Sequence, residues 1–157
     1  MKDILIIGTS HKGYQIRPRC DLQDCADAFK RYLLTTVQKC AVQTVAEEMS
    51  LEALGIRHTV GKEIATERKL RHIYCDPNCS ERQSLGISKD DTPTDYRKRE
   101  EEWLRRVVQS CTYPVLFVCG ACHVDSFANL CRDKGLTPAV VNRDFEDSTI
   151  PLDRRIF

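Results

Sequence analysis

The sequence predicts an α/β fold, with a mostly parallel sheet of about five strands and helices on both faces. Two observations lead to this prediction. Short apolar runs of the kind found in buried parallel strands alternate along the chain with stretches of helical periodicity. No linker or low-complexity segment interrupts the 157 residues, so we expect residues 1–157 to form a single α/β domain.

The expected strands are short runs of mainly apolar residues that end in turn-forming residues. The first run ends at Gly8, the third is followed by Asp76-Pro77, and the fourth is followed by Gly120. We expect strands at residues 4–8, 42–46, 71–75, 115–119 and 138–141.

The expected helices have apolar residues at a spacing of three or four, which is the repeat of one helix face. In the first of them this spacing joins Ala26, Phe29, Leu33, Val37 and Cys40. Another begins near Thr94 and offers for burial Tyr96, Trp103, Leu104 and Val107. We expect helices at residues 21–40, 50–54, 61–70, 94–110 and 124–134, and irregular structure at residues 12–20 and 78–95.

Charge and cysteine content narrow the class of protein. The chain has 24 basic and 23 acidic residues, which gives no electrostatic reason to expect a nucleic acid or an anionic membrane as partner. The apolar stretch after Met1-Lys2-Asp3 is too short for a signal peptide or a membrane span. The nine cysteines, an odd number, then favour reduced thiols in a soluble, cytoplasmic protein.

One pattern occurs twice and indicates a site. The run at residues 4–7 is followed by Gly8-Thr9-Ser10-His11, and the run at residues 115–119 by Gly120-Ala121-Cys122-His123. In both, an imidazole follows the carboxyl end of a strand, which is the edge where open α/β sheets bind ligands. The glycine permits a sharp turn and a close approach of the backbone to a ligand. The pattern predicts that His11 and His123 meet in space, although each histidine can instead cap a turn.

Two adjacent carboxylates, Glu47 and Glu48, end the second expected strand. Because strand side chains alternate, the two point in opposite directions, and one can face solvent while the other reaches the sheet edge. Two histidines and a carboxylate, with open positions for water, form a typical catalytic site for a divalent metal ion such as Mn, Co or Zn. We predict His11, Glu47 and His123 as metal ligands and Glu48 as a catalytic residue, although the sequence does not decide between the two glutamates.

Arg82 and Arg99 are the cationic candidates for catalysis, because a guanidinium can bind a substrate carboxylate or phosphate or stabilise an oxyanion. Arg99 lies in an expected helix and Arg82 in an irregular stretch, and either can instead form a surface salt bridge. Tyr14 and Gln15, just after His11, are expected to line the pocket.

Three competing interpretations involve cysteine. Cys119-Gly120-Ala121-Cys122-His123 has the spacing of covalent haem attachment, a reaction normally carried out outside the cytoplasm. The same two cysteines are placed like a thioredoxin-type dithiol, without the loop expected before the first cysteine. Cys75, Cys79 and His72 offer part of a zinc site and lack the usual second close pair of ligands.

Four segments, in the same order, resemble the Tiki/TraB branch of the erythromycin esterase/ChaN-like superfamily. Ile6-Ile7-Gly8-Thr9-Ser10-His11 is similar to its opening strand with Gly-Thr-x-His, and Val45-Ala46-Glu47-Glu48 to its apolar strand ending in Glu. Arg99-Glu100-Glu101-Glu102-Trp103 resembles its Arg-led helix. Phe117-Val118-Cys119-Gly120-Ala121-Cys122-His123 resembles the second strand of that group, which also ends in Gly-x-x-His. Phe127, Leu130 and Gly135 then match the helix and the glycine turn that follow this strand in the group.

That superfamily contains metal-dependent peptidases, hydrolases of macrolide esters and haem-binding proteins. The resemblance implies a central site of His11, His123 and one of Glu47 and Glu48, with Arg99 nearby. The chain is shorter than the pattern of the group, because the helical segments that usually cover the site are reduced to about residues 50–95.

Two functional hypotheses follow. The first is a metal-assisted hydrolase of an ester, amide or related bond in a small-molecule or peptide substrate, in which the ion lowers the pKa of its bound water. The second is a ligand-binding or sensing module that holds haem, a nucleotide or a small anion in the same pocket without turnover.

Overall fold

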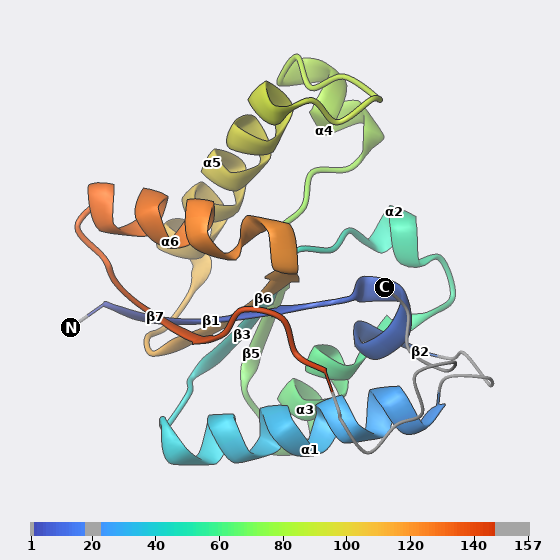
Figure 1. The fold of residues 1–157 in the computed structure, drawn as a ribbon, viewed down its shortest axis with the longest axis vertical. Coiled ribbons are helices and arrows are strands. Elements are labelled where there is room, and N and C mark those ends of the chain that lie inside the picture. The colour runs from blue at the N-terminus through green and yellow to red at the C-terminus, as the bar shows by residue number, and fades with distance from the viewer. Residues whose placement is uncertain (1, 18–22, 147–157) are drawn as a thin grey trace.

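A computed structural model describes residues 2–17 and 23–146, apart from the side chains of residues 11 and 12. Within these residues the main sheet has five strands, all parallel, in the order β5-β3-β6-β1-β7 (Figure 1). The strands are β1 (Asp3–Thr9), β3 (Thr44–Glu47), β5 (Arg71–Tyr74), β6 (Val115–Gly120) and β7 (Thr137–Asn142). The predicted α/β class with a parallel sheet is confirmed.

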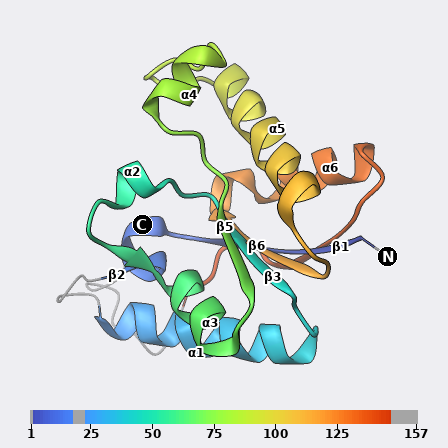
Figure 2. The ribbon, with the colours of Figure 1, turned by 180° about the vertical axis from the view of Figure 1, so that it is seen from behind.

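Helices cover both faces of the sheet, as the two opposite views show (Figures 1 and 2). One face packs against α1 (Gln23–Lys39) and α3 (Val60–Arg68), and the other against α5 (Pro93–Ser110) and α6 (Val124–Asp133). Shorter helices follow strand ends: the π-helical turn η1 (His11–Gln15), α2 (Leu51–Leu54), α4 (Cys79–Ser84) and the 3-10 turn η3 (Ala121–His123). Along the described residues, no helix has the length and apolar character needed to cross a membrane.

The strand order reverses direction once, and this reversal brings three strand ends together at one edge of the sheet. From β1 the chain passes through α1 to β3 and through α3 to β5, always toward the same side of the sheet. It then returns through α5 to β6, which lies between β3 and β1, and continues through α6 to β7. Right-handed crossovers in opposite directions place their helices on opposite faces. The carboxyl ends of β1, β6 and β3 therefore meet at a switch point, where α/β proteins bind ligands.

Alternation along each strand divides the core into two clusters. In β3, Val45 packs on the side of α1 and α3, whereas Ala46 packs on the side of α5 and α6. Both clusters consist of buried and mainly apolar side chains, and burial of each large aliphatic or aromatic member stabilises the fold by roughly 1.5–3 kcal/mol. Trp103 of α5 is the largest buried side chain of the second cluster.

Local signals in the sequence fix where α5 begins. Thr92 accepts a hydrogen bond from the backbone of Asp95, whose carboxylate accepts one from the backbone of Thr92, and Pro93 occupies the first turn. Hydrogen bonds from Ser88 and Thr92 hold the pKa of the Asp95 carboxyl below its usual range.

Two expected loops contain regular structure. Residues 12–20 include part of η1 and the strand β2 (Ile16–Arg17), which pairs with β4 (His58–Thr59) in an antiparallel two-stranded sheet. These elements depend on contacts with distant residues, which local periodicity does not reveal. Residues 78–95 contain α4 and the start of α5, and α4 begins with a reciprocal cap between Asn78 and Glu81.

Gly8 is required because two other segments of the chain lie very close to its Cα. A methyl group at its Cα would lie 2.0 Å from the carbonyl oxygen of Arg143 and 2.5 Å from a methyl group of Val124. The sequence suggested that this glycine makes room for a ligand. The structure instead fills that space with the segment after β7 and with α6.

Candidate functional site

The structure brings together three ionisable side chains from separate segments at the carboxyl edge of the sheet. Glu48 directly follows β3, Arg99 lies within α5, and His123 ends η3, just after β6. All three are buried, with exposed fractions of 5% for Glu48, 6% for Arg99 and 3% for His123. We call these three residues the edge cluster.

Arg99 is the centre of the edge cluster. Its Nη2 lies 2.6 Å from Oε1 of Glu48, its Nε 2.9 Å from Oδ1 of Asp76, and its Nη1 3.2 Å from Oδ2 of Asp91. Burial alone would lower the pKa of Arg99, but the charges of Glu48, Asp76 and Asp91 outweigh it and raise that pKa. Arg99 therefore remains a cation that joins three carboxylates.

His123 is held by a carboxylate on one ring nitrogen and faces another with its second nitrogen. Nδ1 lies 2.8 Å from Oε1 of Glu100, and Nε2 lies 3.6 Å from Oε1 of Glu48. Because a carboxylate only accepts hydrogen bonds, Nδ1 carries the hydrogen in the neutral imidazole, and Nε2 keeps a lone pair. The rings of Trp103 and Tyr96 pack edge-on against the imidazole, with centroids 5.0 and 4.8 Å away.

The backbone also contributes to the edge cluster. The amide nitrogen of Gly120, the first residue of the second Gly-x-x-His, donates to Oε2 of Glu48 at 2.7 Å. Both oxygens of Glu48 therefore have a donor, one from Arg99 and one from the end of β6. Ser126 donates to Glu100 at 2.6 Å and helps to hold the carboxylate that orients His123.

Glu47 lies in a separate group on the other face of the sheet. Its Oε1 accepts a hydrogen bond from Nε2 of Gln15 at 2.8 Å, and its Oε2 contacts Nε2 of His72 at 2.7 Å and the hydroxyl of Thr59. The side chain is completely buried, and Gly61 at the start of α3 packs directly against the carboxylate. We call Glu47 with Gln15, Thr59 and His72 the anchor cluster.

The structure does not bring Glu47 beside His123. Strand alternation places Glu47 on the face of α3 and Glu48 on the face of α5 and α6, where His123 lies. Both glutamates are buried, so neither faces solvent as the sequence allowed. In the described part of the chain no group of three His, Cys, Asp or Glu side chains can hold a metal ion.

His11 begins η1, next to the end of β1, and its side chain lies outside the described residues. Its strand is hydrogen-bonded to the strand that precedes His123, with Thr9 opposite Gly120. The two Gly-x-x-His segments thus start from neighbouring strand ends, and a meeting of the two imidazoles stays a prediction. Of the pocket residues expected after His11, Gln15 belongs to the anchor cluster, and Tyr14 packs against Phe145 in the core.

Arg82, the second cationic candidate, is connected to the edge cluster through Asp76. Its Nη2 lies 2.7 Å from Oδ2 of Asp76, whose Oδ1 accepts from Arg99 and, at 2.9 Å, from Nε1 of Trp103. Arg82 and Asp76 line a cavity at the end of β5, whereas His123 follows β6, two strands away. A chain of ion pairs through Asp76, Arg99 and Glu48 therefore connects Arg82 in this cavity with the imidazole of His123.

The cysteine motifs do not form reactive sites in the structure. Burial, reinforced by the charge of Glu48, raises the pKa of Cys119 far above its usual value and also raises that of Cys122. Both are free thiols, and a raised pKa disfavours the reactive thiolate that a dithiol enzyme needs. Of the suggested zinc ligands, His72 binds Glu47, Cys75 is buried and Cys79 is exposed.

Several site residues were not predicted. Glu100 directly follows Arg99 in the sequence. Its burial could have been predicted, because residues 96, 99, 100, 103 and 107 lie on one face of the helix. Asp91 and His72 have no comparable signal, since each meets its partner only through tertiary structure.

Comparisons with known proteins do not place the chain in a family. A scan against protein-family models, a search of curated proteins and a search of solved structures each returned no match.

Proposed function

We propose that the protein is a hydrolase of an ester, amide or related bond, with the edge cluster as its active site. The observation that carries the proposal is the orientation of His123, whose Nδ1 is held by Glu100 while Nε2 faces Glu48 at 3.6 Å. A neutral imidazole oriented in this way is a suitable general base. Three of the four segments that resemble the Tiki/TraB branch also meet here, which supports the same class of reaction.

In the proposed reaction, Nε2 of His123 removes a proton from water, the hydroxide adds to the carbonyl carbon, and the imidazolium returns the proton to the leaving group. Glu100 keeps the ring in place and stabilises the imidazolium. Arg99 acts as a positioning residue, because it holds the Glu48 carboxylate that faces Nε2 of His123.

The metal ion implied by the resemblance is only partly matched by the described side chains. His123 and Glu48 offer one imidazole and one carboxylate, but Arg99 already neutralises that carboxylate and its charge opposes a second cation. A third ligand is lacking among the described residues, so we derive no step through a metal ion. Mn, Co or Zn at this edge stays a prediction, and elemental analysis of the purified protein tests it.

The experiment measures hydrolysis of a panel of p-nitrophenyl esters and anilides, with and without added Mn, Co or Zn. His123→Gln should lower kcat by about 10²–10⁴-fold, which is the usual contribution of a general base. Glu100→Gln should lower kcat by about 10–100-fold without raising KM, because it disturbs the orientation of the ring and not substrate binding. The matched control is His58→Gln, which alters an exposed histidine that pairs with Glu63.

A ligand-binding module without turnover is the second candidate. It is favoured by the low exposure of His123, at 3%, because a covered imidazole has little access to a substrate. Absence of turnover across the panel in folded protein, with and without the metals, would support this candidate and overturn the hydrolase. Equal loss of activity in His123→Gln and His58→Gln would also overturn the assigned site.

A further inference from the structure

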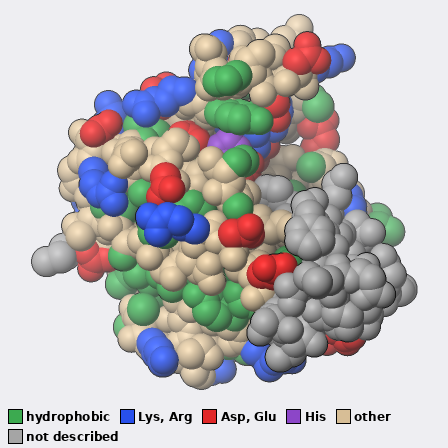
Figure 3. Space-filling view, viewed as in Figure 1, with side chains coloured by type: hydrophobic (Ala, Val, Ile, Leu, Met, Phe, Trp, Pro, Cys, Tyr) green, Lys and Arg blue, Asp and Glu red, His purple; other side chains and the backbone are tan. Residues whose placement is uncertain are grey.

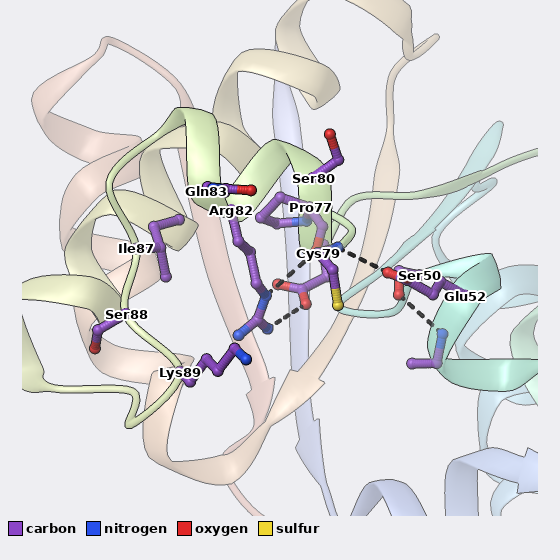
Figure 4. Close-up of a pocket in the computed structure, with 12 residues that line it drawn as sticks. Ser50, Glu52, Pro77, Cys79, Ser80, Arg82, Gln83, Ile87, Ser88 and Lys89 are labelled. Carbon is purple, nitrogen blue, oxygen red and sulfur yellow. Dashed lines mark hydrogen bonds and ion pairs between the residues drawn. The ribbon is translucent and has the colours of Figure 1, made fainter.

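A cavity of about 1030 Å³ opens between α2 and α4 and extends to the loop after α4 (Figure 4). It lies at the carboxyl edge of the sheet, because Ser50 follows β3 and Asp76 follows β5. Its walls combine apolar side chains, among them Pro77 and the buried Ile87, with two cations, Arg82 and Lys89. Such a mixture of an apolar wall and a few charged groups is typical of small-molecule sites.

The two cations in the cavity differ in their partners. Lys89 forms no ion pair or hydrogen bond through its side chain within the described part of the chain, and in Figure 4 it extends toward the same region as Arg82. Arg82 pairs with Asp76 at 2.7 Å and with Asp91 at 3.4 Å, and both carboxylates are shared with Arg99. Lys89 is therefore the cation that is available to a bound anion.

The remaining carboxylate of the cavity does not offset these charges directly. Glu52 accepts a hydrogen bond from the backbone nitrogen of Cys79 at 2.7 Å, which holds its carboxylate at the start of α4. The same carboxylate raises the pKa of the Cys79 thiol, so this cysteine adds no negative charge. On the face seen in Figure 3, acidic and basic side chains are interspersed. The chain has a formal net charge of only +1, so attraction of an anion depends on local cations and not on a general field.

We propose that this cavity binds the oxyanion, carboxylate or phosphate, of a small molecule that also has an apolar part. Arg82 and Lys89 hold the oxyanion, and the wall at Pro77 and Ile87 contacts the apolar part. This binding site does not depend on the hydrolysis proposed at His123, because His123 and Arg99 are not among the residues that line the cavity.

Binding is tested with benzoate, phenyl phosphate and the neutral analogue benzamide, by NMR titration and calorimetry of the full chain. We expect benzoate or phenyl phosphate to bind and to shift the signals of residues around the cavity, and benzamide to bind at least about tenfold more weakly. The relative affinities of the two anions then distinguish a carboxylate from a phosphate site. Affinity should fall as salt concentration rises.

Two substitutions that preserve the fold test the residues. Lys89→Ala should weaken binding of the anion by roughly tenfold, whereas Lys62→Ala, which removes an exposed lysine on α3, should leave it unchanged. Arg82→Lys keeps the charge and should weaken phenyl phosphate binding by losing the two-pronged geometry.

The proposal is overturned if neither anion binds at millimolar concentration, if benzamide binds equally well, or if Lys89→Ala and Lys62→Ala behave alike. Its failure is distinct from that of the proposed function. Anion binding without turnover removes the hydrolase and keeps the cavity, whereas turnover of neutral esters without anion binding removes the cavity and keeps the hydrolase.

Discussion

The edge cluster and the anchor cluster begin at two adjacent glutamates, yet they differ in charge and in what they connect. Glu47 is enclosed by an amide, a hydroxyl and an imidazole, and these groups tie η1, β4 and β5 to the end of β3. Glu48 meets a guanidinium and a second imidazole, and the ion pairs of Arg99 continue to a cavity. Both clusters are expected to contribute to stability, and we propose that the edge cluster alone also acts on a ligand.

The largest expected effect on stability comes from the centre of the edge cluster. Arg99→Ala leaves Glu48, Asp76 and Asp91 without their shared cation, and we expect the free energy of unfolding to fall by about 5 kcal/mol. Urea denaturation measures the loss. Arg105→Ala, which removes an exposed arginine from the same helix, should cost less than about 1 kcal/mol, and equal losses would contradict the proposed role of Arg99.

The anchor cluster should respond in stability and not in catalysis. Glu47→Ala leaves Gln15, Thr59 and His72 without their common acceptor, and we expect a loss of about 3 kcal/mol. The rate per folded molecule should be unchanged. Glu101→Ala, at an exposed glutamate, is the control, and a Glu47→Ala protein as stable as this control would show that the anchor cluster contributes nothing.

Gly61 provides a smaller and sharper test of the same cluster. A methyl group there would lie 2.6 Å from Cδ of Glu47, so Gly61→Ala should destabilise the protein by about 1–3 kcal/mol. In the Glu47→Ala background the same change should become neutral or stabilise by up to about 1 kcal/mol, because the conflict is gone and alanine favours the helix. Additive effects in this double-mutant cycle would contradict the close contact.

The smallest effect is expected at Cys122, next to His123. Its raised pKa, due first to burial and then to Glu48, leaves the thiol protonated near neutral pH. Cys122→Ser should therefore preserve the hydrolysis rate and the stability. A large loss of rate in a folded Cys122→Ser protein would contradict this prediction and would support a catalytic role for the thiol, as a dithiol or as a nucleophile.

The fold was predictable because buried parallel strands and amphipathic helices have recognisable local sequence patterns. The caps of α4 and α5 likewise involve residues that are close together in the sequence. Glu48, Arg99 and His123 were identified because each follows a strand or lies in a strongly patterned helix. The separation of Glu47 from His123 depends on which face each strand residue takes. The proximity of β6 to both β1 and β3 depends on the strand order, and neither property is visible in local periodicity.

The most direct measurement compares the hydrolysis rates, per folded molecule, of Glu48→Gln and Glu47→Gln on the best ester of the panel. Both changes replace a buried carboxylate by an amide of the same shape, at the last residue of β3 and at the residue directly after it. We predict a loss of about 10²–10³-fold for Glu48→Gln, because the charge that organises Arg99 and faces His123 is removed, and no loss for Glu47→Gln. Equal losses, or a greater loss for Glu47→Gln, would contradict the assignment of function to the edge cluster.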